Sequence, residues 1–223
     1  MTGGPAGGGA FGGDPYRVLA RAAAEWDVLE PLLGAEGVAR LGAALRRLRE
    51  AAGARDAAVE AARVLAGALP PGEGGRLVTT AGPPSPGAYA GFRAEDLAVL
   101  VLDRHRMVGP VLGPVRERLL AVPALSDEDV RGRGGDPFAS GLIRLRGEGG
   151  VGRLPRFQFS EDALPWLVVL EVNALLGADE DPWGAADWWL SENAWLASAP
   201  VALLGSGLDE RLVGAAHALV DGV

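Results

Sequence analysis

The sequence predicts a mainly α-helical protein built from small helical domains, with one β-hairpin preceding the C-terminal helical domain. Two patterns in the 223 residues predict this fold. Apolar residues recur at intervals of three and four over most of the chain, which is the period of an amphipathic helix. Alternation of apolar and polar residues, which is typical of paired strands, is confined to two short stretches near residue 150.

The N-terminal part is expected to form a helical bundle. Residues 1–14 are rich in glycine and carry too little apolar surface to offset their backbone entropy, so we expect them to be disordered. Residues 15–69 contain three helical stretches, with Gly34 and Gly53 as stops and Asp56 as the N-cap of the third. These stretches predict an N-terminal helical bundle.

A domain boundary is predicted after this bundle. Residues 70–92 concentrate proline and glycine, which favours a linker. Residues 93–125 contain two helical stretches separated by the breakers Gly109, Pro110, Gly113 and Pro114. This part is therefore predicted to be a helix-turn-helix-like segment.

Four arginines make that segment a candidate DNA-binding element. On this hypothesis the phosphate contacts are made by Arg104, Arg106, Arg116 and Arg118. Two prolines in the turn are unusual for a recognition motif, and interspersed acidic residues reduce the positive charge of the face. The alternative is a helical pair that packs beneath the hairpin or forms a dimer seam.

Residues 126–159 are predicted to form a loop followed by the β-hairpin. The loop is polar and rich in glycine. Apolar and polar residues alternate over 142–146 and again over 154–159, and the glycines between them supply a turn. This is the one strand pair that the sequence predicts.

Residues 160–223 are predicted to form an acidic, tryptophan-rich helical domain. Ser160 or Asp162 is expected to cap its first helix. Asp181 and Pro182 then stand in the order of an N-cap followed by the first helical residue, which is the preferred way to begin a helix.

The negative charge of the protein is concentrated in this last part. The net charge is −8, yet residues 1–156 hold 20 arginines against 18 acidic residues, a net charge of +2. Residues 157–223 hold one arginine, Arg211, against 11 acidic residues, a net charge of −10. Such a field repels nucleic-acid phosphates and attracts basic surfaces, so any DNA contact is expected upstream.

Five of the six tryptophans lie within 30 residues of one another. They are Trp166, Trp183, Trp188, Trp189 and Trp195. A domain of this size is not expected to bury them all, and neighbouring residues on a helix point about 100° apart, so at least one of the adjacent pair should reach the surface. Exposed aromatic rings are typical of interface centres. The alternative is that the rings form the core of a small helical domain.

An ordered series of landmarks resembles a known family. The series consists of PRFQF at 155–159, DPWGAADWWLSENAWL at 181–196, Pro200, the pair Leu203–Leu204 and the pair Ala215–Ala216. It resembles the toxin-binding domain shared by Xre, MbcA and ParS type antitoxins, which are the partners of RES-domain toxins that destroy NAD. The similarity extends over roughly residues 154–220.

The resemblance implies a compact helical domain that covers the active-site cleft of the toxin, with dimerisation and an upstream DNA-binding part for autoregulation. Trp188 and Trp189 match the family's helix before a turn, Asn193 matches the turn asparagine, and Pro200 with Leu204 matches a Pro-x-x-x-Leu segment. With the neighbouring tryptophans, the predicted partner-binding residues are Trp183, Trp188, Trp189, Asn193, Trp195, Pro200 and Leu204.

The sequence offers little for catalysis. His105 and His217 are the only histidines and stand far apart, and neither a metal-binding spacing nor a phosphate-binding loop is present. We therefore expect a non-enzymatic protein without a metal or cofactor. The absence of cysteine favours a reducing cytoplasm, and the N-terminal stretch lacks the apolar run of a signal peptide or membrane span.

Two functional hypotheses follow. The first is an antitoxin-like protein that binds and neutralises a RES-type toxin through its C-terminal domain, self-associates and autoregulates transcription through upstream residues. The alternative is a non-enzymatic scaffolding or adaptor protein that uses the same domain to bind a different protein partner.

Overall fold

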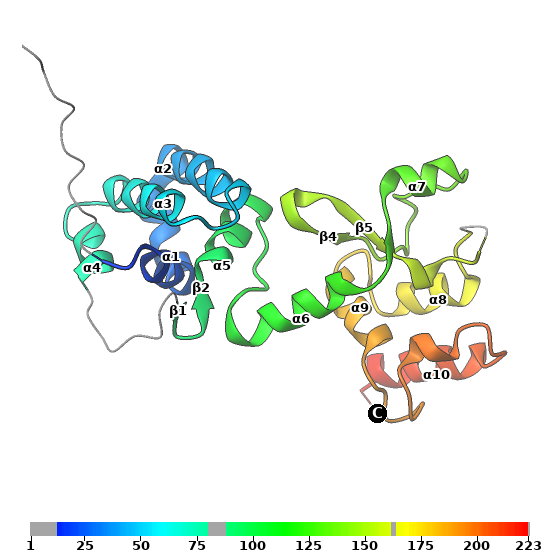
Figure 1. Ribbon diagram of the computed structural model, residues 1–223. Coiled ribbons are helices and arrows are strands. Elements are labelled where there is room, and N and C mark those ends of the chain that lie inside the picture. Colours follow the sequence, from blue (N-terminus) through cyan, green and yellow to red (C-terminus); the bar gives the residue numbers. More distant parts are fainter. Residues whose placement is uncertain (1–12, 80–87, 162–163, 223) are drawn as a thin grey trace, which may run out of the picture. The chain divides into compact units, whose positions relative to one another are not determined.

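The computed structural model describes residues 13–79, 88–161 and 164–222 (Figure 1). The described chain is mainly α-helical with a little antiparallel β-structure, which confirms the predicted fold class. It divides into two compact units, residues 1–113 (unit 1) and 114–223 (unit 2). Each unit has its own apolar core.

Unit 1 is a helical bundle. Its described elements are α1 (Pro15–Ala24), α2 (Trp26–Glu50), α3 (Arg55–Ala68), α4 (Glu73–Thr79), β1 (Ala88–Tyr89), β2 (Phe92–Arg93), α5 (Ala94–Ala98) and the π-helix η1 (Val99–Asp103). Helix α1 packs against α3 and α5, and α2 packs against α3. The three helices predicted over residues 15–69 thus form the first part of a larger unit.

Local signals in the sequence define the ends of these helices. The carboxylate of Asp14 accepts a hydrogen bond from the Tyr16 backbone N–H at 3.2 Å and caps α1. Gly34 interrupts α2 with a φ of 62°, and Gly53 follows the end of α2 with a φ of 77°. Both glycines act as the predicted stops. Residues 1–12 lie outside the described chain, so the disorder expected there stays a prediction.

The described part of the predicted linker, residues 70–92, contains regular structure instead. It includes α4 and the strand pair β1–β2, while residues 80–87 lie outside the described chain. Arg76 of α4 donates hydrogen bonds to Glu25 at 2.7 Å and to Glu73 at 2.9 Å. The ion pair with Glu25 holds α4 against the bundle, a long-range contact that proline and glycine content does not indicate.

The predicted helix-turn-helix segment also differs from the structure. The first helix passes into η1 and ends at Arg104, whose φ is +52°. The predicted turn is the first part of a continuous helix, α6 (Gly109–Ala121), and the boundary between the units falls within it. Pro110 stands in the first turn, where the backbone N–H groups have no partner within the helix, so proline is tolerated there.

Unit 2 combines a small sheet with four described helices beyond α6. Its elements are β3 (Ala124–Leu125), α7 (Asp127–Gly132), β4 (Leu145–Arg146), η2 (Glu148–Gly150), β5 (Gly152–Pro155), η3 (Arg156–Gln158), α8 (Leu167–Leu175), α9 (Pro182–Leu190), η4 (Pro200–Leu203) and α10 (Asp209–Val220). The strand order is β3-β5-β4, all antiparallel. Helix α10 packs against α8.

The hairpin is shorter than the alternating stretches 142–146 and 154–159 predicted. At Ile143 there is no strand-to-strand backbone pairing. The side chain of Gln158 forms hydrogen bonds with the Ile143 backbone instead. The Gln158 amide accepts from the Ile143 N–H at 2.7 Å and donates to the Ile143 carbonyl at 2.9 Å. Gln158 is fully buried, so these bonds satisfy both its polar atoms and the backbone.

The first helix of the acidic part begins later than predicted. Its N-cap is Trp166, preceded by Pro165, whereas Ser160 lies outside any helix and Asp162 lies outside the described chain. The second helix begins as predicted, because the Asp181 carboxylate accepts from the Gly184 N–H at 2.9 Å.

Candidate partner-binding surface

The tryptophans of unit 2 divide into buried and exposed rings. Trp189 has no exposed surface, and Trp183 and Trp188 are half-buried against the core. Trp195 is 55% exposed and Trp166 is 38% exposed. The expectation that this domain exposes some indole surface is therefore met, most fully by Trp195 and Trp166, and in the adjacent pair Trp188 keeps partial exposure while Trp189 has none.

Trp189 is a core residue. Its ring packs at 5.2 Å edge-to-face against Trp188 and at 5.6 Å against Phe157. Its Nε1–H donates a 2.8 Å hydrogen bond to Asn173, which is also fully buried. A side chain enclosed in this way cannot contact a partner without unfolding, so the partner-binding role expected for Trp189 is replaced by a structural one.

Pro200 and Leu204 likewise belong to the interior of unit 2. Pro200 is buried, and Leu204 packs against the core cluster with partial exposure. Pro200 occupies the first position of η4, where proline is favoured. These two residues shape the segment between α9 and α10 and offer little surface of their own.

Trp195 lies on a loop that is closed by hydrogen bonds. The side-chain oxygen of Asn193 accepts from the backbone N–H of Trp195 at 2.9 Å and of Leu196 at 3.3 Å. The Asn193 N–H also donates to the Ser198 carbonyl at 3.1 Å. Asn193 thus holds the turn that presents Trp195, which gives it a positioning role.

Trp166 and Trp195 both lie beside the start of α10. The Trp166 ring lies next to Gly205, where an added Cβ would come within 3.9 Å of its Cη2 atom. The Trp195 carbonyl accepts a 3.5 Å hydrogen bond from Arg211 in the first turn of α10. Both contacts are therefore made by residues 205–211, at or just before the start of α10.

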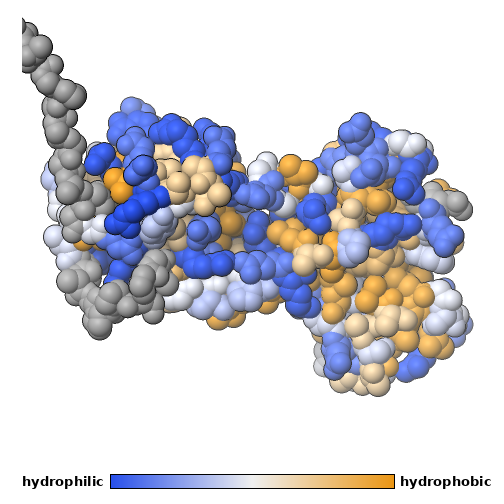
Figure 2. Space-filling model, in the orientation of Figure 1, coloured by the Kyte–Doolittle hydropathy of each residue, from blue (hydrophilic) through white to orange (hydrophobic). Residues whose placement is uncertain are grey.

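We call this region the tryptophan surface and define it by four exposed apolar residues. They are Leu164, Trp166, Leu167 and Trp195. Figure 2 shows apolar side chains gathered on the face of unit 2 that carries α8, α9 and α10. Exposed large apolar side chains of this kind are typical of protein-interaction sites.

Acidic side chains accompany the tryptophan surface. Glu192, Asp209 and Glu210 are exposed and have no ion-pair partner within the described chain. Asp209 and Glu210 stand in the first turn of α10, and Glu192 precedes the Trp195 loop. Their positions combine apolar rings with negative charge at one end of the unit.

The four arginines proposed to contact DNA fall in different units. Arg104 and Arg106 belong to unit 1, and Arg116 and Arg118 belong to α6 in unit 2. Two of them already pair with carboxylates. Arg106 pairs with Asp27 and with Glu30 at 3.3 Å, and Arg118 pairs with Asp187. Neither unit by itself assembles all four arginines into one basic face.

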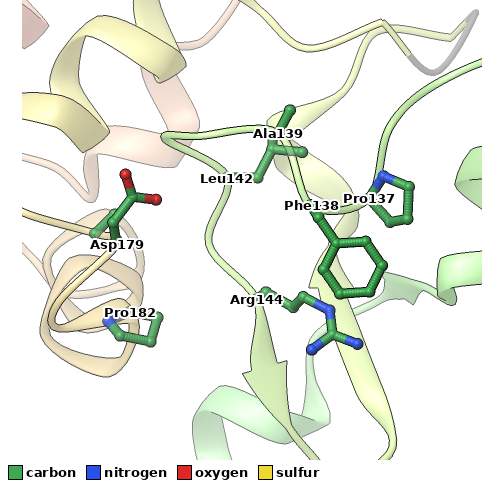
Figure 3. A pocket seen from close by; sticks show the side chains of 8 residues that line it. Pro137, Phe138, Ala139, Leu142, Arg144, Asp179 and Pro182 are labelled. Atoms are coloured by element: carbon green, nitrogen blue, oxygen red, sulfur yellow. The ribbon is translucent and has the colours of Figure 1, made fainter.

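A pocket in unit 2 forms a second feature, which the sequence did not indicate. It has a volume of about 170 Å³. Residues that line it include Pro137, Phe138, Leu142, Arg144, Asp179 and Pro182 (Figure 3). The sequence did not indicate the pocket because its lining joins the loop around Phe138 to residues some 40 positions later.

Among the described residues, no group of three or more histidine or acidic side chains is arranged to hold a metal ion. None of the helices in that part of the chain is both long enough and apolar enough to cross a membrane.

Comparison with known proteins gives no relative. No family model, no curated protein and no solved structure matches this chain. What the structure defines is a mainly α-helical protein of two units whose acidic second unit exposes two indole rings.

Proposed function

We propose that the protein is antitoxin-like, and that unit 2 binds and neutralises a RES-type, NAD-degrading toxin through the tryptophan surface. The observation that carries this proposal is the exposed Trp195 ring on a turn fixed by Asn193. A large aromatic side chain carried on an ordered backbone turn requires little ordering of the chain on binding, which is the property of an interface anchor.

Burial of the exposed rings by a partner would contribute favourably to the free energy of binding. A tryptophan side chain buries some 150–250 Å² when fully covered, and about half of the Trp195 ring surface remains exposed. Covering roughly 100 Å² of apolar surface contributes about 2.5 kcal/mol before the costs of association. Trp166 and Leu167, which are also exposed, add to this value where the partner covers them.

The charge of the same region favours a basic partner. Residues 157–223 carry a net charge of −10, and exposed carboxylates accompany the tryptophan surface. A cleft built for an anionic dinucleotide is lined by cationic groups, which an acidic protein complements. The association rate should therefore fall as ionic strength rises.

An assay of NAD consumption tests the proposal. A purified RES-type toxin is incubated with NAD and increasing amounts of the full chain, and the remaining NAD is measured. We expect inhibition by the wild type and an inhibition constant at least tenfold weaker for Trp195→Ala and for Trp166→Ala. Phe138→Ala, which removes another exposed aromatic ring of unit 2, is the matched control and should inhibit like the wild type.

The adaptor alternative is favoured by one observation. Trp189 and Pro200, which the resemblance places at the toxin interface, are buried in the structure. If no RES-type toxin is inhibited, yet a different purified basic protein binds in a manner lost in Trp195→Ala, the adaptor hypothesis replaces the antitoxin hypothesis. Failure of Trp195→Ala to affect either kind of binding would exclude the tryptophan surface as the interface.

A further inference from the structure

We propose that the pocket beside Phe138 binds a small aliphatic carboxylate, with the apolar chain inside the pocket and the carboxylate at its cationic mouth. This site is independent of the tryptophan surface. The pocket volume of about 170 Å³ lies below the 300–1,000 Å³ of sites for drug-sized ligands, so its capacity suits one branched side chain or a compact small molecule.

The walls of the pocket are mostly apolar. Pro137 and Leu142 come from the segment before β4, and Pro182 comes from the first turn of α9. Ala139 and Ala178 complete the walls with small side chains, which leave the space open. An aliphatic group placed here exchanges water for carbon contacts, which is favourable in proportion to the area covered.

Two guanidinium groups flank the exposed ring at the mouth. Phe138 is 60% exposed, with the Arg144 guanidinium 4.6 Å and the Arg131 guanidinium 5.5 Å from its ring centroid. Asp127 accepts hydrogen bonds from Arg144 at 2.6 and 3.1 Å. Asp127 is paired with Arg144, so the Arg131 guanidinium beside the exposed ring, which has no ion-pair partner in the described chain, is the cationic group that can receive an incoming anion.

The acidic residue in the lining is occupied by its own loop. Asp179 accepts a hydrogen bond from the Ser140 hydroxyl at 2.6 Å and from the Gly141 N–H at 3.1 Å, one on each carboxylate oxygen. These bonds lower the pKa of Asp179, with the Ser140 hydroxyl as the main cause. Asp179 therefore fixes the loop that carries Phe138 and is not directed at a ligand.

The pocket is formed in advance of binding. Besides the bonds to Asp179, the Phe138 N–H donates to Asp136 at 2.9 Å, and the Gly141 carbonyl accepts from the buried Asn173 amide at 2.7 Å. Binding consequently requires little ordering of the loop, which conserves affinity for a small ligand.

Titration of the ¹⁵N-labelled full chain with N-acetyl-leucine, followed by NMR, tests the proposal. We expect saturable shifts of the backbone amides of Phe138, Gly141 and Asp179. N-acetyl-leucinamide, which lacks the carboxylate, should bind roughly tenfold more weakly, because a charge-assisted hydrogen bond is lost. Absence of saturable shifts, or equal binding of the two probes, overturns the proposal.

Substitutions then locate the two halves of the site. Arg131→Gln should weaken the binding of N-acetyl-leucine several-fold while leaving the Asp127–Arg144 pair intact. Ala139→Leu should abolish binding by filling the pocket. Arg146→Gln changes an exposed arginine of β4 outside the lining and is the matched control. If Arg131→Gln and Arg146→Gln bind alike, the cationic mouth is not the carboxylate site.

Two further titrations identify which kind of carboxylate the pocket binds and test whether the pocket acts independently of the tryptophan surface. Tighter binding of acetyl-Leu-Glu-amide than of N-acetyl-leucine would assign the site to an acidic, leucine-containing peptide, and the reverse order to a free small acid. Trp195→Ala should leave binding of N-acetyl-leucine unchanged, so a failure of the tryptophan surface and a failure of the pocket are distinguished. Loss of N-acetyl-leucine binding in Trp195→Ala would contradict the independence of the two sites.

Discussion

The indole N–H of Trp189 donates a 2.8 Å hydrogen bond to the side-chain oxygen of Asn173, and neither residue has exposed surface. The Asn173 amide in turn donates to the Gly141 carbonyl at 2.7 Å and to Gln158 at 3.3 Å. Asn173 of α8 is therefore connected to α9, to the loop before β4 and to Gln158.

Replacement of Asn173 should destabilise unit 2 strongly. Asn173→Ala leaves the Trp189 N–H and the Gly141 carbonyl without these partners in the interior, and we expect a loss of roughly 2–4 kcal/mol in the free energy of unfolding. Urea denaturation followed by near-UV circular dichroism measures it. Glu171→Ala, at an exposed polar position of the same helix, should change the free energy by less than about 0.5 kcal/mol.

Loss of the Asn193 side chain should loosen the turn that carries Trp195. Asn193→Ala removes two hydrogen bonds to backbone N–H groups, so we expect the amides of Trp195 and Leu196 to exchange with solvent at least fivefold faster, equivalent to about 1 kcal/mol. Hydrogen exchange measured by NMR gives the rates. Unchanged exchange at both amides would show that other contacts hold the turn.

A glycine at position 197 should stabilise the same turn. Ala197 has a φ of +54°, a conformation that costs an L-residue about 1–2 kcal/mol. Ala197→Gly removes this strain but adds freedom to the unfolded chain, and we expect a net gain of about 0.5 kcal/mol. Ala199→Gly, where φ is −65°, should instead destabilise by roughly the same amount. Thermal unfolding of the two variants compares them directly.

The stability of unit 1 should depend on the ionisation of Glu25. Burial acts to raise the pKa of Glu25, but hydrogen bonds from Arg76 and Arg21 outweigh it, and the net effect is a lowered pKa. A carboxyl whose folded-state pKa is depressed stabilises the fold above its ordinary pKa of 4.5, and this contribution is lost as the pH falls through the lower folded-state value.

Glu25→Gln should therefore lower the stability at pH 7 and flatten its decline below about pH 4.5. Urea denaturation at several pH values between 7 and 3 provides the test. Glu36→Gln is the matched control, because Glu36 is highly exposed and its ion pair with Arg40 spans 3.9 Å. A wild-type pH profile retained by Glu25→Gln would contradict the assignment.

The sequence predicted those elements that local chemistry determines. Gly34 and Gly53 interrupt or follow helices as expected, and Asp181 with Pro182 begins α9. Each of these signals acts over a few residues, through a φ angle or a cap bond, so the pattern alone is enough.

The missed features depend on contacts between distant positions. The hairpin shortens because the Gln158 side chain bonds to Ile143, 15 positions away, and α4 is held by Arg76 reaching Glu25. For the candidate site, the excess of tryptophan was visible in the sequence. The sequence did not show which ring reaches solvent, because the burial of Trp189 depends on the tertiary position of Asn173 against it.

The division of the indoles into enclosed and exposed rings gives the protein optical reporters without any label. The buried rings of Trp26 and Trp189 should emit at short wavelength and the exposed rings of Trp166 and Trp195 at longer wavelength, because emission shifts to the red as an indole meets water. A molecule that covers Trp195 would change mainly the red component, whereas melting of the interior would change the blue one. Binding of a partner and unfolding of the protein should therefore change the emission spectrum in different ways.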